Sequence, residues 1–290
     1  MNQPIVDVLL PLALGFIMFS LGLTLSLGDF ARLLARPRAM AVGLAGQVVL
    51  VPLVAFAVAS LSGLPPAMAA GLMIVAASPG GASSGLITHL ARGDTALSIS
   101  LTAVTSLASV ATLPLVLDAS LRHFLGTGVA SGLPVGTLVR GVFFLATVPV
   151  ALGMVVRARR PALTARIGPV TERIATALFL LIVLATFASQ RQTLVDNFAT
   201  VGPAALLHNV AVMAMGFGLA ATGGLALRDR IAISIECGLH NAAVGIFIAA
   251  TVLHSPEMTV PSVVYALLMN LTAICLIVFM RRRRPACATG

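Results

Sequence analysis

Long apolar stretches follow one another along the whole chain, and short polar or arginine-containing segments separate them. A helix needs about 20 predominantly apolar residues to cross the hydrocarbon core of a bilayer. The pattern therefore predicts an all-α polytopic membrane protein with nine transmembrane helices. Their predicted ranges are 4–25, 39–61, 66–90, 95–117, 135–156, 172–189, 203–226, 230–253 and 261–280.

Composition agrees with this pattern, and the charges add an orientation. The chain has 290 residues, of which 59% are hydrophobic and 9% charged, and its net charge is +9. All eighteen basic residues are arginines, and they lie between the apolar spans rather than in a soluble domain, so the charge does not indicate a nucleic-acid partner. With the N-terminus outside and the C-terminus in the cytoplasm, fifteen arginines fall inside and three fall outside, as the positive-inside rule requires. A multi-pass protein of the plasma (inner) membrane is expected, with the lipid bilayer as its surroundings and no obligate protein partner.

Two of the predicted spans are interrupted at mid-membrane depth. The third contains Pro-Gly-Gly-Ala-Ser-Ser at 79–84, and the eighth contains Glu-Cys-Gly-Leu-His-Asn at 236–241. Proline and glycine end a helix, and Ser83 and Ser84 are candidates to cap a second half-helix. Non-helical backbone at this depth is tolerated only where it is buried in protein or lines a wet cavity. Spans 2–4 and 7–9 run in opposite senses with a break in each middle member, which predicts an inverted repeat and a transporter with its site at the breaks.

Glu236 is the one acidic residue at mid-membrane depth, and burial there costs about 2.5–3.5 kcal/mol. No arginine lies at similar depth, so a bound cation or a proton is the expected compensation; a hydrogen-bonded neutral acid with a structural role is the alternative. Oxygen donors for a hard cation occur on other spans at similar depth. They are Gln47, Ser84, Ser98 and Thr102.

These residues and motifs resemble the bile acid:sodium symporter family. The similarity runs nearly end to end and includes the motif at 79–84, Ala-Arg-Gly-Asp-Thr-Ala-Leu-Ser at 91–98 and the motif at 236–241. The resemblance implies the nine-helix form of the family, without the first helix of its ten-helix bacterial members. The resemblance implies a panel domain moving against a core in which two discontinuous helices cross. The implied division is 1–38 (panel helix 1 and a loop), 39–118 (core helices 2–4), 119–202 (panel helices 5–6) and 203–290 (core helices 7–9 and a basic tail).

The resemblance also implies up to two sodium sites, and both depart from the family pattern. One falls on Ser84, Gly85, Ser98, Thr102 and Glu236, and the other on Gln47, Glu236, the carbonyls of Cys237 and Leu239, and His240. The family usually has asparagine in place of Gly85 and glutamine in place of His240. Each site has therefore lost a side-chain oxygen, and imidazole is a poor ligand for hard cations. Three possibilities stay open: sodium coupling through the remaining oxygens, proton coupling through His240 and Glu236, and uncoupled exchange.

The family's substrate region corresponds to Ala82, Asn241 and Asn270. The usual threonine is replaced by Ala82, which removes a hydroxyl. The implied substrate is a small organic anion: a bile acid, or a carboxylate such as a keto acid or a pantoate-like acid. Alternating-access symport is therefore the leading hypothesis, and the protein is not expected to be an enzyme. An intramembrane enzyme would need paired acids, a nucleophile with its base, or a metal. A channel would need a continuous charged or carbonyl-lined pore.

Overall fold

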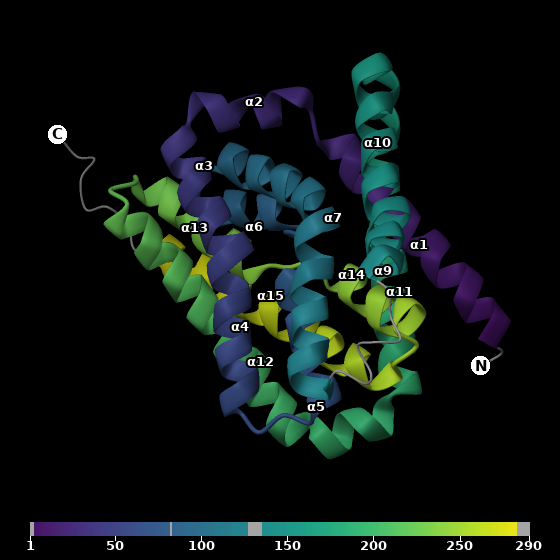
Figure 1. The fold of residues 1–290 in the computed structure, drawn as a ribbon. Helices are drawn as coiled ribbons and strands as arrows, with labels where there is room; N and C mark the ends of the chain where they lie inside the picture. Colours follow the sequence, from purple (N-terminus) through teal and green to yellow (C-terminus); the bar gives the residue numbers. More distant parts are fainter. Residues whose placement is uncertain (1–2, 82, 127–134, 283–290) are drawn as a thin grey trace.

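The computed structural model describes residues 3–81, 83–126 and 135–282, and the regular elements among these residues are all helices (Figure 1). The elements up to the first break are α1 (Gln3–Thr24), α2 (Leu27–Ala35), α3 (Pro37–Leu44), η1 (Ala45–Leu50), α4 (Val51–Leu61) and α5 (Pro66–Ala77). Those up to the second break are α6 (Ser84–Leu90), α7 (Thr95–Leu125), α9 (Val135–Val142), η2 (Phe143–Thr147), α10 (Val148–Arg159), α11 (Pro161–Ser189), α12 (Arg191–Thr222) and α13 (Leu227–Gly238). The remainder are α14 (Ala242–Phe247), η3 (Ile248–Val252), η4 (Pro256–Met258) and α15 (Thr259–Arg282).

Six helical stretches among the described residues are long and apolar enough to cross a membrane. They are Pro37–Leu61, Thr95–Leu125, Val139–Arg159, Pro161–Ser189, Arg191–Thr222 and Pro256–Met280. Three shorter apolar helical stretches, Val8–Thr24, Pro66–Ala77 and Ala242–Val252, lie within the first, third and eighth predicted spans. The prediction of an all-helical membrane protein is confirmed at this level.

Several helices extend beyond the apolar ranges that predicted them. The sixth span was expected from 172, yet α11 begins at Pro161, and the seventh was expected from 203, yet α12 begins at Arg191. A search for apolar stretches cannot find these turns, because they carry charged residues while their backbone remains helical. The predicted connection 26–38 also contains α2, whose start is fixed by Asp29 accepting hydrogen bonds from the backbone and hydroxyl of Ser26 at 2.7 and 2.8 Å.

Two groups of close helix contacts stand out, and one core of buried apolar residues joins them. In one, α1 packs against α10 and α11, and α1 lies beside α10 at one side of the molecule in Figure 1. Gly22 of α1 and Gly153 of α10 allow the two backbones to touch, because a Cβ on either glycine would collide with the other helix. In the other group, α7 lies against α5, α6 and α13, while α12 lies against α4, α13 and α15.

One arginine ties together the ends of both interrupted segments. Arg36, between α2 and α3, pairs with Asp94 at 2.5 Å and with Asp229 in the first turn of α13 at 2.8 Å. Asp94 also caps α7 by accepting from the backbone amides of Ala96 and Leu97, both at 3.0 Å. Burial alone would raise the pKa of Asp94, but the Leu97 amide, the Arg36 charge and the other hydrogen bonds outweigh it and hold that pKa below its usual value.

Arg36→Gln is expected to destabilise the protein by about 1–2 kcal/mol, since it leaves the buried Asp229 without its partner while Arg36 itself is partly solvated. Because the pKa of Asp94 is lowered on folding, the contribution of this pair is complete above the ordinary carboxylate pKa and is lost as pH falls through the lowered one. Thermal unfolding of purified protein measures both effects. The exposed Arg38 is the matched control, and equal losses for Arg36→Gln and Arg38→Gln would contradict the role of the cluster.

Candidate functional site

The two interrupted segments cross and bond to each other through their backbones. The amide of Gly81 donates to the carbonyl of Leu239 at 2.9 Å, and the amide of Asn241 donates to the carbonyl of Pro79 at 2.9 Å. Gly80 and His240 lie opposite each other in this short antiparallel bridge. The backbone groups that leave the helices thus satisfy one another in place of water. Both breaks fall where the sequence predicts them.

A second set of bonds holds the end of α13 at the break. The carbonyl of Gly238, free of a helical partner, accepts from Asn209 Nδ2 at 2.7 Å and from the Tyr265 hydroxyl at 2.9 Å. Thr272 in turn donates to Asn209 Oδ1 at 2.5 Å. The sequence prediction missed this support. The available signals were Tyr265, the single tyrosine of the chain, and the amide Asn209, which both stand in predicted apolar spans.

Glu236 lies directly beside the crossing and is 1% exposed. The hydroxyl of Ser98 donates to its Oε1, and the hydroxyl of Thr102 lies 3.1 Å from Oε1 and 3.0 Å from Oε2. Ser84 lies 3.1 Å from Thr102 and 3.5 Å from Ser98, oxygen to oxygen. Four of the predicted residues, from α6, α7 and α13, therefore meet in one buried cluster.

The two serines at the start of α6 do not cap it as expected. Ser83 occupies the N-cap position without a side-chain capping bond, and Ser84 directs its hydroxyl to the Glu236 cluster instead. Gly85, a member of the first predicted ion site, follows Ser84 directly. A Cβ at Gly85 would first meet the side chain of Ile99, at 3.1 Å.

Gly80 is a site residue that the sequence identified only as a helix breaker. A Cβ built on Gly80 would lie 2.5 Å from Glu236 Oε2, 3.0 Å from Thr102 Oγ1 and 3.4 Å from Gln47 Nε2. The absent side chain lets the backbone approach the acid and leaves the three polar groups gathered around one point. Gln47 itself comes from the π-helical turn η1, a distortion often found at functional sites.

The second predicted set is brought together less directly. Gln47 is 4% exposed, and neither atom of its amide has a hydrogen-bond partner among the described residues. The carbonyl of Leu239 is used by Gly81, and the thiol of Cys237 faces Gly46 and Gly216. His240 donates through Nδ1 to the carbonyl of Ser78 at 3.3 Å, and its ring lies near those of His208 and Tyr265. Within the described part of the chain no hydrogen bond or ion pair joins His240 to Glu236.

The predicted substrate residues are separated. Asn241 is 6% exposed, caps α14 by accepting from Val244, and turns its amide nitrogen to Met18 Sδ of α1 at 3.7 Å, so it lies where the two helix groups meet. Asn270 is exposed and donates to the carbonyl of Ala266 in its own helix. Ala82 lies outside the described residues.

The chemistry of the cluster is that of oxygen ligands around a single buried carboxylate. Hard monovalent or divalent cations prefer carboxylate, hydroxyl and carbonyl oxygens. Ser98 and Thr102 now donate to Glu236, and a cation between them would change these hydroxyls from donors into ligands while neutralising the acid. The residues present therefore fit a small hard cation.

The sequence also matches the model of a known protein family. The sequence model of the Sodium Bile acid symporter family matches residues 11–197, more than half of the chain. The chain belongs to the sodium bile acid symporter family. The predicted resemblance to this family is thereby confirmed.

Named relatives in this symporter family resemble the chain over most of its length. A probable sodium/metabolite cotransporter of rice chloroplasts (BASS2) is 32% identical over 95% of the chain. An uncharacterized sodium-dependent transporter of Bacillus subtilis (YocS) is 29% identical over 93%. A probable sodium/metabolite cotransporter of Arabidopsis thaliana chloroplasts (BASS1) is 29% identical over 92%. The chain spans 64%, 82% and 65% of the lengths of these three proteins. All three are named as transporters or cotransporters, which agrees with the prediction that this chain is not an enzyme.

Proposed function

We propose that this chain is a secondary active transporter that couples the movement of a small organic anion to a cation, sodium, by alternating access. The observation that carries the proposal is Glu236, buried where two interrupted helices cross and surrounded by hydroxyl oxygens. A cation that neutralises Glu236 would stabilise the crossing, so that occupancy of the ion site and the shape of the protein are linked. The named relatives, which are sodium-dependent transporters by description, support the choice of sodium.

The arrangement proposed for the membrane is nine spans with inverted repeats. Residues 1–38 and 119–202 form the panel, and residues 39–118 and 203–290 form the core. The close packing of α1 with α10 and α11 supports a panel that moves as one body, and the mutual bonding of the two breaks supports a core that does the same. The arginine distribution supports an outer N-terminus and a cytoplasmic C-terminus in a plasma membrane.

The proposed substrate position lies between panel and core, at Asn241, with Ala82 and Asn270 as further contacts. Asn241 supports this placement because its amide faces Met18 of α1 directly beside the crossing. The sequence places no arginine near the two breaks in the predicted spans, so the site suits one small carboxylate whose charge is balanced by the co-bound cation. The proposal therefore favours small metabolites, and it includes bile acids as candidates.

A thermal-shift screen of purified protein tests the proposal. Organic anions are compared in sodium and in potassium at several pH values, because a ligand that binds only the folded state raises the unfolding temperature. The proposal predicts stabilisation by sodium and further stabilisation by one class of anion in sodium only. Stabilisation that follows pH and is indifferent to sodium would favour the proton-coupled alternative, and no response to either ion would leave uncoupled exchange.

His240→Gln restores the residue usual in the family and is expected to lower the sodium concentration for half-maximal stabilisation by about 3–10-fold. Glutamine can donate to the Ser78 carbonyl as His240 does and still offer an oxygen to the ion. One added ligand oxygen corresponds to roughly that change in affinity. His89→Gln is the matched control, because His89 is exposed and lies outside the predicted ion sites. An unchanged or weaker sodium response in His240→Gln would show that the side chain at 240 does not reach the ion.

A further inference from the structure

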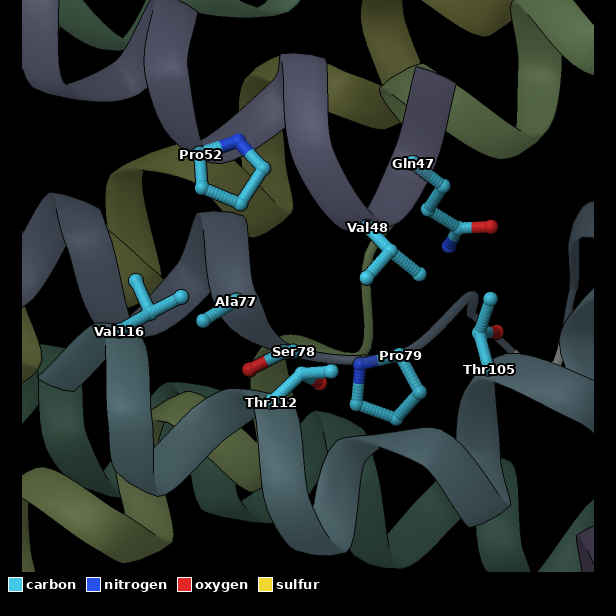
Figure 2. A pocket seen from close by; sticks show the side chains of 9 residues that line it. All are labelled: Gln47, Val48, Pro52, Ala77, Ser78, Pro79, Thr105, Thr112 and Val116. Carbon is cyan, nitrogen blue, oxygen red and sulfur yellow. The ribbon is translucent and has the colours of Figure 1, made fainter. Parts of the chain in front are cut away.

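A small cavity lies between η1, the start of α4 and the middle of α7, adjacent to the break after α5 (Figure 2). Its polar lining consists of Gln47, Ser78, Thr105 and Thr112, and its volume is about 10 Å³, enough for one water-sized occupant. Figure 2 shows Gln47 descending from η1 on one side, while Thr105 and Thr112 come from α7 on the other. We call this space the η1–α7 cavity.

The hydroxyls of the η1–α7 cavity have already used their protons. Ser78 donates to the carbonyl of Ile74 at 2.8 Å, Thr105 to that of Thr102 at 3.3 Å and Thr112 to that of Ala108 at 3.2 Å. The oxygens of these hydroxyls can therefore only accept a hydrogen bond from an occupant of the cavity or coordinate a cation there. A single water has two protons to give, whereas the hydroxyl oxygens of Ser78 and Thr112, the oxygen of Gln47 and Thr105 Oγ1, which also accepts from the Gly80 amide at 3.5 Å, line the space. This surplus of oxygen acceptors suits a small hard cation.

Gln47 connects the cavity to Glu236. Its side chain is 4% exposed, lines the cavity, and has no partner for its nitrogen or oxygen among the described residues. Burying an amide without hydrogen-bond partners costs free energy. A cation coordinated by the amide oxygen of Gln47 would offset part of that cost. The amide nitrogen of Gln47 lies near the point beside Gly80 that Glu236 Oε2 and Thr102 Oγ1 also approach.

Threonines and serines continue this path along one face of α7. Ser98, Thr102, Thr105, Ser109 and Thr112 alternate in steps of four and three residues, which places them in one stripe. The stripe begins at Glu236 and passes the η1–α7 cavity toward the Leu125 end of α7, away from Arg36.

Contacts between the same helices flank the cavity along α7. Toward the Arg36 end, Gly43 of α3 lies so near Leu101 of α7 that a Cβ would come within 2.7 Å of that side chain. Toward the Leu125 end, the ring of Phe56 of α4 lies 4.7 Å from that of His123 and 5.5 Å from that of Phe124, between ring centroids. Between these contacts the lining residues Val48, Thr112 and Val116 are only half-buried, so the cavity is partly open to the surface of the helix group.

We infer that the η1–α7 cavity is an access site for the coupling cation, in which Gln47, Ser78, Thr105 and Thr112 hold it transiently on its way to Glu236 from the Leu125 end of α7. This inference rests on the proposed function. It assigns a site inside the helix group of α7, separate from the boundary with α1 where the substrate is placed. The ion and the organic anion then reach the crossing by different routes.

The test removes the oxygens of the access site without changing its shape. Thr105→Val and Thr112→Val are combined, because valine has nearly the volume of threonine and lacks the hydroxyl. Val116→Leu, which enlarges a side chain that lines the cavity, serves as a second and independent variant. Thr176→Val on α11 is the control, since its hydroxyl also donates to its own helix, at 2.8 Å to Glu172, but lies outside the cavity. Sodium jumps on proteoliposomes adsorbed to a solid-supported membrane give the relaxation rate, and titration gives half-saturation.

The double variant and Val116→Leu are each expected to slow the sodium-induced relaxation about tenfold while half-saturation stays within about twofold, because a step on the route changes rates and leaves the final site intact. Unchanged rates would overturn the inference and leave the cavity as a water site only. Raised half-saturation with unchanged rates would also overturn it, since the oxygens would then belong to the final site. If the wild-type protein itself gives no sodium response, the proposed function fails and this inference fails with it.

Discussion

Replacing Glu236 with glutamine is expected to abolish sodium-stimulated uptake of the organic anion while the protein stays folded. Glutamine keeps the shape of the side chain and an oxygen that Ser98 can donate to, so the crossing retains its hydrogen bond. What it removes is the negative charge whose burial requires a cation. The cation offsets a burial cost of about 2.5–3.5 kcal/mol for the charged carboxylate, and losing this contribution to binding corresponds to roughly a 100-fold loss of sodium affinity. Uptake into proteoliposomes with and without a sodium gradient measures the effect.

Glu257→Gln is the control for this change. Glu257 is exposed in η4, directly before the start of α15, and makes no contact with the Glu236 cluster among the described hydrogen bonds, so removing its charge should leave the sodium dependence unchanged. A Glu236→Gln variant with undiminished sodium-stimulated uptake would exclude Glu236 as the ion ligand and would favour the reading of Glu236 as a neutral structural acid.

Gly80→Ala should produce the second-largest loss, with sodium half-saturation raised at least tenfold and a small change in unfolding temperature. The added methyl group would lie 2.5 Å from Glu236 Oε2, closer than these atoms can approach, and would also lie in tight contact with Thr102 Oγ1 at 3.0 Å. Ser98 and Thr102 hold the carboxylate in place, so the collision displaces the very groups that would bind the ion. Sodium titration by thermal shift, with uptake measured in parallel, distinguishes lost affinity from lost folding.

Gly218→Ala in α12 provides the comparison for Gly80→Ala. A Cβ at Gly218 meets nothing within 4 Å among the described residues, and alanine favours a helix over glycine. Gly218→Ala should therefore transport normally. Normal sodium affinity in Gly80→Ala would mean that the close approach of backbone and carboxylate has no part in ion binding.

The central part of the site could be predicted because it depends on strong local signals. Pro79 and Gly80 must interrupt a helix, and an acid such as Glu236 in an apolar span must find polar neighbours, of which Ser98 and Thr102 share a helix face. The structure places these groups together as expected. Gly80 was recognised as a breaker but not as a contact of the acid, because no local sequence pattern shows that the break after α5 lies beside the end of α13.

Other features depend on long-range contacts that no local pattern signals. Arg36, Asp94 and Asp229 lie on three separate elements, and only the folded chain brings them together. In the sequence, Asn209 and Tyr265 are polar residues within apolar spans, and no local pattern indicates that both donate to the free carbonyl of Gly238. The early starts of α11 and α12 were missed for a different reason: hydropathy identifies the apolar part of a helix and says nothing of its polar ends.

Equilibrium binding of sodium-22 to the purified protein tests the central claim most directly. The wild-type protein is predicted to bind sodium saturably, with displacement by unlabelled sodium and little displacement by potassium, and the folded Glu236→Gln variant is predicted to lose this binding. Saturable binding that persists in Glu236→Gln, or a wild-type protein that binds no sodium, would contradict the claim that a cation neutralises Glu236 at the crossing.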